Sequence, residues 1–600
     1  MAVQDSQTGT AVQYIALPFF SWPLHEAERL VLTENDVSPT PLHETLAQVL
    51  TLCDQWRSLE EHTAVAIEKM PVLQPHTQQL LQGLKHMVER GLLVDAAKLS
   101  QVYAKPDSSE PAPEPIKTLY VRTYRCPNAL ERLLSSLQNG RAGASVNTLV
   151  VVDDAREASD LDLSRTLLSK WRPQLSATVI HITRADRERL ADTLAAASGA
   201  DAQDLRWWLN GDPNDPEMTA GATFNTALLL SAGTATAIMD DDAQLTPYGD
   251  PQEASQMGVA GSEVAHWSMY ASTEALQSAW SPLDIDPLAA HSRWLGQSLS
   301  TLSAQTENPC DFWQSVTSAD LHNLKPGATV KVSANGLLGD PGTGQASWLY
   351  TLPPEQLSPW LQSEDTYRQL VSRRLLARRP QGHKLIPRHA LLTPLVGVDN
   401  RTLMPPTIPN GRGEDAVFVE LLCCVYPDSL FAQLPWMLKH EPERERQFDR
   451  DKLLQPANVD SGRFMTLYLR RLRHTVPSAE PQTRLQWLGQ SLKTLAQAPE
   501  ATLASEYRRH LSDDRSSMAR ELIRNLQTLQ PPPYLAEDMQ LLLTRSTRDI
   551  GADQQALTAT LAQLRQRAER YSQALASWHT AWDHCRQLGE AQSLAMAGTE

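Results

Sequence analysis

The sequence predicts an α/β fold in its middle part, with one further unit before it and a helical one after it. Between residues 116 and 445, apolar strand-like runs alternate with helical patterns, as in a sheet covered by helices. A proline-rich stretch at residues 105–115 cannot pack as a helix or a central strand, so we interpret it as a linker after residues 1–104. Residues 446–600 are rich in Leu, Gln, Arg and Ala, which predicts a helical domain.

The first unit contains three predicted helices. Apolar residues recur at helical spacing in residues 41–56, and Ser58 with Glu61 has the form of a capping box that opens a second helix. A third helix buries Leu80 and Leu84 and ends at Gly91, where a left-handed C-cap costs little. Three short helices that end in such a turn predict a winged-helix-like domain.

The middle part begins with a strand at residues 118–124 and a following helix. Residues 147–154 form a continuous apolar run that ends in two carboxylates, which is typical of a central parallel strand facing a ligand crevice. Residues 177–183 predict a third strand, and a helix at 221–232 leads into a strand at 235–239. In the tail, residues 554–589 fit one long helix or a hairpin of two.

Charge and cysteine content exclude several classes of protein. The 600 residues include 54 Lys plus Arg and 70 Asp plus Glu, and the net charge of −16 disfavours nucleic acid and anionic lipid as partners. The six cysteines form no CxxC pair, and Met1 is not followed by a signal-like segment, so we expect a cytoplasmic protein. No run approaches the roughly 18 apolar residues of a membrane span.

The strongest local signal is the acidic triplet Asp240-Asp241-Asp242, directly after an apolar strand. Three adjacent like charges repel one another unless they are solvated, capped or neutralised by a cation. Carboxylate oxygens suit Mg²⁺ or Mn²⁺ that also binds phosphate oxygens. The triplet therefore predicts either a divalent metal site or a solvated acidic turn.

The stretch Gly221–Asp242, with its Asn-containing helix, Gly233, short strand and acidic triplet, resembles the central block of GT-A nucleotide-sugar glycosyltransferases, particularly the inverting family 2. The resemblance implies that Asp240 and Asp242 are metal ligands at the ends of the family's Asp-x-Asp motif. Residues 121–130 and 150–154 are similar to the family's first strand and helix and to its base-contacting strand. The nucleotide-binding residues implied in this way are Thr123, Arg125, Asp153, Asp154, Asn225 and Asp241. Thr123 and Arg125 could instead merely finish a strand.

A second acidic pair, Glu414 and Asp415, follows Gly411 and Gly413 at the predicted start of a helix. Carboxylates in a first helical turn are stabilised by the helix dipole, so the pair could be no more than first-turn charges. The resemblance implies more, because family 2 enzymes carry a Glu-Asp pair here whose Asp deprotonates the acceptor. It assigns Asp415 as the catalytic base, with Glu414 in reserve.

His440 follows this pair at about the spacing where some GT-A enzymes place a metal-binding or diphosphate-binding histidine. A lone histidine can equally be structural.

Two other sequence patterns have simpler interpretations. The Arg-rich run at residues 373–379 predicts an amphipathic helix with a solvated charged face. The Gly-rich residues 331–344 predict a surface loop, with an acceptor-binding or phosphate-binding loop as the alternative.

The resemblance covers residues 116–445 and implies a GT-A domain, a Rossmann-like nucleotide-diphospho-sugar transferase fold. Residues 1–104 are similar to the peptide-recognition domains of enzymes that modify ribosomally made peptides. Together these imply an inverting, Mn²⁺- or Mg²⁺-dependent hexosyltransferase-like enzyme that moves a sugar from a nucleoside-diphosphate donor to a peptide or protein. A glycan-directed transferase and a catalytically silent GT-A scaffold are the alternatives. The long insertion at residues 250–325 departs from the family's pattern and leaves the acceptor open.

Overall fold

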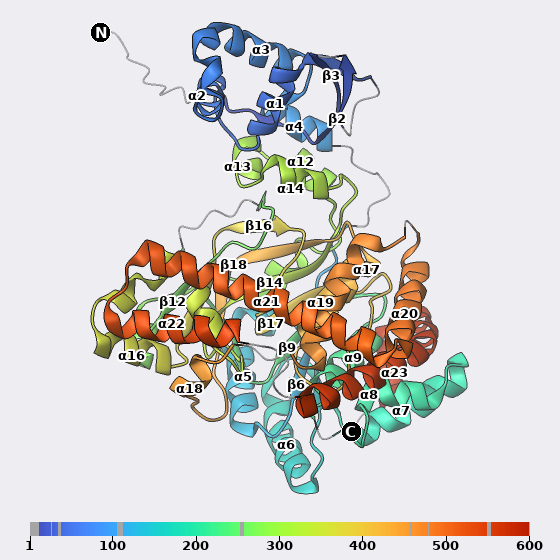
Figure 1. Ribbon diagram of the computed structural model, residues 1–600. Helices are drawn as coiled ribbons and strands as arrows, with labels where there is room; N and C mark the ends of the chain where they lie inside the picture. Colours follow the sequence, from blue (N-terminus) through green and yellow to red (C-terminus); the bar gives the residue numbers. More distant parts are fainter. Residues whose placement is uncertain are drawn as a thin grey trace, which may run out of the picture.

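The computed structural model describes residues 11–25, 27–33, 38–104, 112–215, 217–251, 257–456, 459–477, 479–548 and 554–598. Figure 1 shows an N-terminal unit at the top, a large sheet in the middle of the body, and C-terminal helices around that sheet. Residues 105–111 of the predicted linker lie outside the described residues. Among the helices that the structure describes, none has the length and apolar character that crossing a bilayer requires.

The N-terminal unit combines a small antiparallel sheet with four helices. The sheet has the strand order β2-β3-β4, and a short strand β1 pairs with β5. Ser58 and Glu61 form the predicted capping box, and Gly91, at φ 73°, turns the chain from α3 toward β5. The elements are β1 Ile15–Ala16, β2 Phe19–His25, β3 Glu28–Thr33, β4 Thr40–His43, α1 Glu44–Leu52, α2 Leu59–Lys69, α3 Thr77–Glu89, β5 Leu93–Val94 and α4 Ala96–Tyr103. The helices and the small sheet are compatible with the winged-helix prediction, which stays a prediction.

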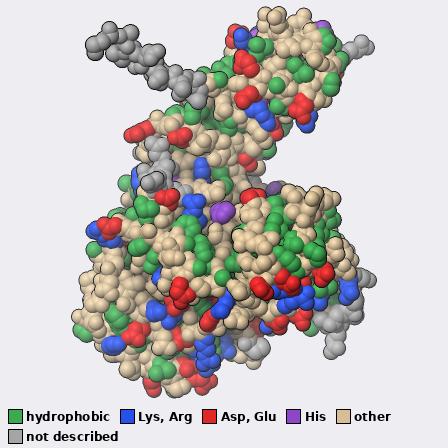
Figure 2. Space-filling view, turned by 90° about the vertical axis from the view of Figure 1, so that its left-hand side faces the viewer, with side chains coloured by type: hydrophobic (Ala, Val, Ile, Leu, Met, Phe, Trp, Pro, Cys, Tyr) green, Lys and Arg blue, Asp and Glu red, His purple; other side chains and the backbone are tan. Residues whose placement is uncertain are grey.

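This unit contacts the body through three short helices, α12 Leu299–Gln305, α13 Pro309–Trp313 and α14 Ser318–Asn323. Trp313 stands at the centre of the contact: its carbonyl accepts from Trp56 Nε1 at 2.9 Å and its own Nε1 donates to Ser100 Oγ at 2.8 Å. The ring of Tyr103 lies 4.9 Å from that of Trp313. Figure 2 shows the unit as a lobe joined to the body by a narrower waist.

The body is built on a large mixed sheet, so the predicted α/β fold is confirmed. Its main path within the described residues is β11-β16-β18-β14-β17-β9-β6-β7-β8. Strands β9, β6, β7 and β8 are parallel, whereas β17 runs antiparallel to both β9 and β14, and β14 is parallel to β18. The carboxyl ends of β6, β7, β9 and β18 therefore lie at one edge of the sheet.

The strands of this path are β6 Thr118–Thr123, β7 Thr148–Asp153, β8 Thr178–Ile182, β9 Ala235–Asp240, β11 Met257–Val259, β14 Val330–Gly339, β16 His383–Ile386, β17 Leu395–Asp399 and β18 Leu430–His440. Further strands are β10 Ala243–Gly249, β12 Ala265–Met269, β13 Ser281–Pro282 and β15 Leu376–Pro380. The body's other helices up to residue 425 are α5 Pro127–Asn139, α6 Ala158–Trp171, α7 Arg184–Ser198, α8 Ala202–Asn210, α9 Ala220–Leu230, α10 Thr273–Ser278, α11 Pro287–Ser292, α15 Pro354–Leu357, α16 Glu364–Ser372 and α17 Glu414–Val425.

Successive residues of the central strands face two different hydrophobic clusters. Tyr120 and Val150 belong to one cluster, and their neighbours Leu119 and Val151 belong to the other. Both faces are buried, which is why these strands are continuously apolar in sequence.

The C-terminal helices contribute to the first of these clusters and to a separate one. They are α18 Arg450–Leu453, α19 Ser461–Leu472, α20 Pro481–Gln497, α21 Glu500–Leu529, α22 Pro533–Thr547, α23 Gln554–Leu588 and α24 Glu590–Ala597, so residues 554–588 form one helix and not a hairpin. Helices α19, α20, α21, α23 and α24 contribute to the first cluster, and α18 and α22 to the separate one. The ring of Trp578 on α23 lies 5.8 Å from that of Trp208 on α8. These helices thus share a core with the sheet, and the domain boundary at residue 446 stays a prediction.

Two predictions for the middle part are wrong. The Arg-rich run does not continue a helix: α16 ends at Ser372 and strand β15 follows, with Arg378 only 1% exposed and paired to Glu263. Residues 331–339 belong to the fully buried strand β14, so the surface-loop prediction is wrong for them, whereas residues 340–344 lie outside any helix or strand. In both places long-range strand pairing and ion pairs overrode the local pattern.

Candidate active site

The acidic triplet lies where the sequence predicts it, at the carboxyl end of β9. Asp240 is the last residue of the strand, and Asp241 and Asp242 lead into β10. The carboxylate of Asp240 accepts a hydrogen bond from Arg122 Nη2 at 2.5 Å. Its side chain is 36% exposed, which leaves it open on one side to a ligand.

Asp242 pairs with the last residue of β18. His440 Nε2 lies 3.0 Å from Asp242 Oδ1, and His440 Nδ1 lies 2.6 Å from the carbonyl oxygen of Asp340. Burial disfavours a charged imidazole, but the charge of Asp242 outweighs burial and raises the pKa of His440 to about 9. The Asp340 carbonyl fixes the ring and leaves Nε2 directed at the acidic triplet.

Asp240, Asp242 and His440 form the cluster that could hold a divalent cation. Each offers one ligand atom, and these atoms all lie within 4.8 Å of one another. Two carboxylates and one imidazole are a donor set that suits Mn²⁺ and related ions. These three residues are the ones that the sequence resemblance implies as metal ligands.

Asp241 is directed elsewhere, into the body. It is buried and accepts hydrogen bonds from Thr123 Oγ1 at 2.6 Å and from the Tyr124 amide at 3.3 Å. Burial, with the charge of Asp242, raises the pKa of Asp241 well above its usual range. Thr123 therefore contacts the triplet, where it orients the middle carboxylate.

Glu414 and Asp415 open helix α17, after Gly413 at φ 86°. Glu414 Oε1 lies 3.2 Å from Arg122 Nη1, and Asp415 Oδ1 accepts from the Ala416 amide at 2.7 Å. Burial and the charge of Glu414 raise the pKa of Asp415 to about 7, against the opposing effects of Ala416 and Arg122. A carboxyl with a pKa near neutrality is suited to general-base work.

Arg122 joins the two acidic groups, and sequence reasoning missed it. It lies on β6 beside Thr123, and its guanidinium contacts Asp240 through one terminal nitrogen and Glu414 through the other. A charged residue within the apolar run of a central strand was the signal that could have revealed it, since a buried arginine is costly unless paired.

A second pair that the sequence does not reveal holds the histidine in place. Arg374 donates to both carboxylate oxygens of Asp340, at 2.6 and 2.8 Å, and Arg446 Nη2 lies 3.0 Å from the same group. This arrangement fixes the carbonyl of Asp340 that binds His440 Nδ1.

The carboxylates at the end of β7 have partners within the protein. Asp153 Oδ2 lies 3.1 Å from His181 Nε2, and Asp154 Oδ1 accepts from Arg184 Nη1 and Arg187 Nη2, both at 2.6 Å. Both carboxylates are buried. They lie at the predicted edge of the sheet, but these hydrogen bonds run to the protein itself.

The two remaining predicted nucleotide-binding residues are not in contact with the acidic cluster. Arg125 has an exposed side chain that pairs with Asp160 at 2.9 Å. Asn225 is completely buried on α9, where it donates to the Thr407 carbonyl and accepts from the Thr407 amide. Because Thr407 Oγ1 donates to the Glu414 carbonyl, Asn225 supports the start of α17 from behind.

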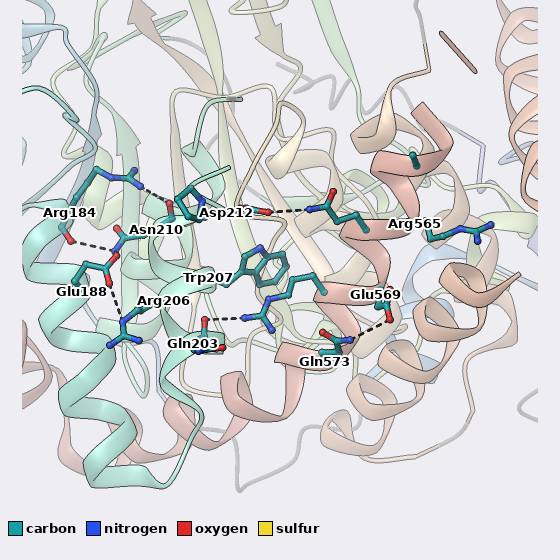
Figure 3. A pocket seen from close by; sticks show the side chains of 15 residues that line it. Arg184, Glu188, Gln203, Arg206, Trp207, Asn210, Asp212, Arg565, Glu569 and Gln573 are labelled. Carbon is teal, nitrogen blue, oxygen red and sulfur yellow. Dashed lines mark hydrogen bonds and ion pairs between the residues drawn. The ribbon is translucent and has the colours of Figure 1, made fainter. Parts of the chain in front are cut away.

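A cavity of about 820 Å³ lies apart from this cluster, between α7, α8 and α23. Figure 3 shows Trp207 in its wall, and the Arg570 guanidinium lies 5.4 Å from that ring. Arg184 is shared between the cavity and Asp154. None of the residues that line the cavity belongs to the acidic cluster, so the cavity is separate from the candidate metal site.

No family model and no curated protein matches the chain. Among solved structures, the S. aureus protein TarS (residues 1–349) in complex with UDP-GlcNAc is similar over 72% of this chain and 90% of its own, with 12% identity and a TM-score of 0.27. The mannosyltransferase PcManGT from Pyrobaculum calidifontis, in complex with GDP-Man and Mn²⁺, is similar over 81% and 93%, with 11% identity and a TM-score of 0.24. These values are too low to assign the chain to a family, and a function has to be inferred from the site residues themselves.

Proposed function

We propose that the chain is a metal-dependent, inverting glycosyltransferase that moves a sugar from a nucleoside-diphosphate donor to a peptide or protein. The observation that carries the proposal is the meeting of two sites: the cluster Asp240, Asp242 and His440, and the near-neutral carboxyl Asp415. Arg122 connects them. The first site suits a cation and a diphosphate, and the second suits removal of a proton from an acceptor.

Asp240, Asp242 and His440 would hold Mn²⁺ or Mg²⁺, which supplies the positive charge that stabilises a departing diphosphate. His440 is held in place through Nδ1, so Nε2 is the atom that it would offer, after releasing the proton that its raised pKa of about 9 keeps on the ring. Thr123 and the Tyr124 amide keep Asp241 oriented behind the two ligands. These contacts support a site whose ligands are positioned before the donor arrives.

Asp415 accepts the proton of the acceptor in this proposal. The acceptor oxygen or sulfur forms a bond to the anomeric carbon while the bond from that carbon to the diphosphate breaks. The proton moves to Asp415, and the electron pair leaves with the diphosphate. A single displacement of this kind inverts the anomeric centre, and the partial exposure of Asp415 leaves it within reach of an incoming acceptor.

The acceptor class is supported by the N-terminal unit. Strand β2 forms an edge of the described β2-β3-β4 sheet, and Phe20, Trp22 and Leu24 alternate along it with exposed fractions of 50%, 49% and 39%. An edge strand with an apolar outward face suits an extended polypeptide, which can add as a further strand. The ring of Phe20 also lies 6.5 Å from that of His322 on α14, so this face continues onto the body.

The experiment is a donor screen. The purified protein is incubated with Mn²⁺ and each common nucleotide sugar, and released nucleoside diphosphate is measured. We expect slow hydrolysis of one donor that EDTA stops and that Asp242→Asn abolishes. No release from any donor, with or without candidate peptides, would remove the catalytic proposal and favour a silent scaffold.

A further inference from the structure

Arg122 is the residue of the site that the proposed reaction does not yet use. Its Nη2 contacts Asp240 Oδ1 at 2.5 Å, its Nη1 contacts Glu414 Oε1 at 3.2 Å, and Nη1 also lies 3.4 Å from the Ala220 carbonyl oxygen. The side chain is 16% exposed, and Phe224 lies against it with its ring centre 5.5 Å from the guanidinium carbon. Its Nε is buried and has no hydrogen-bond partner among the residues that the structure describes.

Each carboxylate of the cluster already has a cationic partner within the protein. Asp240 is paired with Arg122, and Asp242 is paired with His440. Burial disfavours the charge of Arg122, but Asp240 and Glu414 outweigh burial and raise its pKa, so the guanidinium is a permanent cation. A divalent ion at the cluster has to share Asp240 with this cation at short range.

We propose that Arg122 is a positioning residue and the protein's own counter-ion for Asp240: it competes with the divalent cation for that carboxylate and keeps Glu414 when the cation takes it. The inference rests on the cation site of the proposed function. Two partners make this exchange inexpensive, since Arg122 remains paired with Glu414 after Asp240 turns to the metal. Glu414 is also the first residue of α17, so its contact with Arg122 fixes the helix end that carries Asp415.

Two opposite effects follow from removing this charge. Asp240 loses its competing partner, so Mn²⁺ binds more tightly to the protein. The start of α17 loses its anchor, so sugar transfer becomes slower. A purely structural role for Arg122 predicts instead that both properties become worse together.

The test measures Mn²⁺ alone, by electron paramagnetic resonance of the free ion during titration, for wild type, Arg122→Met and Arg122→Lys. We expect Arg122→Met to bind Mn²⁺ about tenfold more tightly, because the charge-assisted hydrogen bond from Arg122 to Asp240 no longer has to be broken. Arg122→Lys keeps the charge and should bind Mn²⁺ nearly as the wild type does. Transfer should be slower in both, because Met has no donor and Lys lacks the two separate terminal nitrogens through which Arg122 contacts Glu414 and Asp240.

Arg567→Met is the matched control. Arg567 is also a buried arginine with two carboxylate partners, Asp215 at 2.8 Å and Glu217 at 2.9 Å, but it lies on α23 outside the cluster. It should leave Mn²⁺ affinity unchanged. If Arg122→Met does not fold, Glu414→Gln serves in its place: it leaves Arg122 to Asp240 alone and should weaken Mn²⁺ binding.

The possible results test the role of Arg122 and the proposed cation site separately. Unchanged or weaker Mn²⁺ binding by folded Arg122→Met, with wild-type binding intact, overturns the role of Arg122 and leaves the proposed function standing. Absence of Mn²⁺ binding in the wild type overturns the cation site and this inference with it. Tighter binding together with slower transfer supports both.

Discussion

His440 Nε2 lies 3.0 Å from Asp242 Oδ1, although one residue ends β18 and the other follows β9. Strands β17 and β14 lie between these two strands in the sheet, so the sequence alone does not show that the two residues meet. With Asp240 the two residues form the one cluster of potential metal ligands found among the described residues.

Removing the outer carboxylates should abolish metal binding without unfolding the chain. We expect Asp240→Ala with Asp242→Ala to lose Mn²⁺-dependent binding of nucleoside diphosphates, because two of the three ligands are gone. Calorimetric titration of UDP and GDP with Mn²⁺ measures this. Wild-type affinity in the double variant would exclude the cluster as the metal site.

Asp415→Asn should slow transfer and leave donor binding almost unchanged, since a base acts on the acceptor. Loss of a general base typically costs a factor of about 10²–10⁴ in rate. The comparison variant is Glu414→Gln, which keeps Asp415. If Glu414→Gln abolishes transfer and Asp415→Asn does not, the roles of the two residues are exchanged.

The substitution Asp415→Asn should also change the thermal stability of the protein, by an amount that depends on pH. The folded-state pKa of Asp415 is raised from 3.8 to about 7, so ionisation costs folding free energy. This cost is absent below pH 3.8, grows as the pH rises toward about 7, and is complete above it. Asp415→Asn should therefore raise Tm more at pH 8 than at pH 4, and an equal change at both pH values would contradict a raised pKa.

The rate of transfer should depend on pH through Asp415. The base must be ionised, so we expect the rate to fall as the pH drops below about 7. Glu414→Gln removes the like charge that raises this pKa, and its acid limb should move to lower pH. The profile is measured with saturating donor and metal. An acid limb at the same pH in both proteins would show that another group controls it.

Arg374→Met should weaken Mn²⁺ binding although Arg374 is not a ligand. It holds Asp340, whose carbonyl oxygen lies 2.6 Å from His440 Nδ1. Loss of such an outer partner commonly costs about 10–100-fold in metal affinity. Arg373→Met is a neighbouring control, because Arg373 pairs with Glu445 at an exposed position. Equal losses in both variants would argue against a specific role for Asp340.

Trp22→Ser should weaken transfer to a peptide acceptor at low concentration and leave donor hydrolysis intact. Trp22 is half exposed on the edge strand β2, so the change removes apolar contact area and no core packing. Val72→Ser, at another exposed apolar residue of the same unit, is the control. A Trp22→Ser variant with wild-type transfer at every acceptor concentration would favour the glycan-directed alternative.

The sequence was sufficient for the elements that are periodic or that end in charges. Strands β6, β7 and β9 could be predicted because they are buried on both faces, and the acidic groups because each lies at the end of such a strand or at the start of a helix. Asp242 and His440 could be proposed as ligands of one metal only through the resemblance, since no local sequence pattern links the two residues. The structure supplies that contact.

The rest depended on contacts between distant segments. Arg122 is one charged residue in an apolar strand, and nothing local shows that it reaches both Asp240 and Glu414. Arg378 is buried because β15 pairs with β12 and β14, which its helix-like sequence does not reveal. Asn225 is placed by its bonds to Thr407, far along the chain.

The cation site is tested most sharply by the position of Mn²⁺ in crystals grown with the ion and a nucleoside diphosphate, located by anomalous scattering. We expect a single strong peak bonded to Asp240, Asp242 and His440, with diphosphate oxygens completing its coordination. A peak elsewhere, for instance in the cavity beside Trp207, or a diphosphate bound without metal at the cluster, would contradict this expectation.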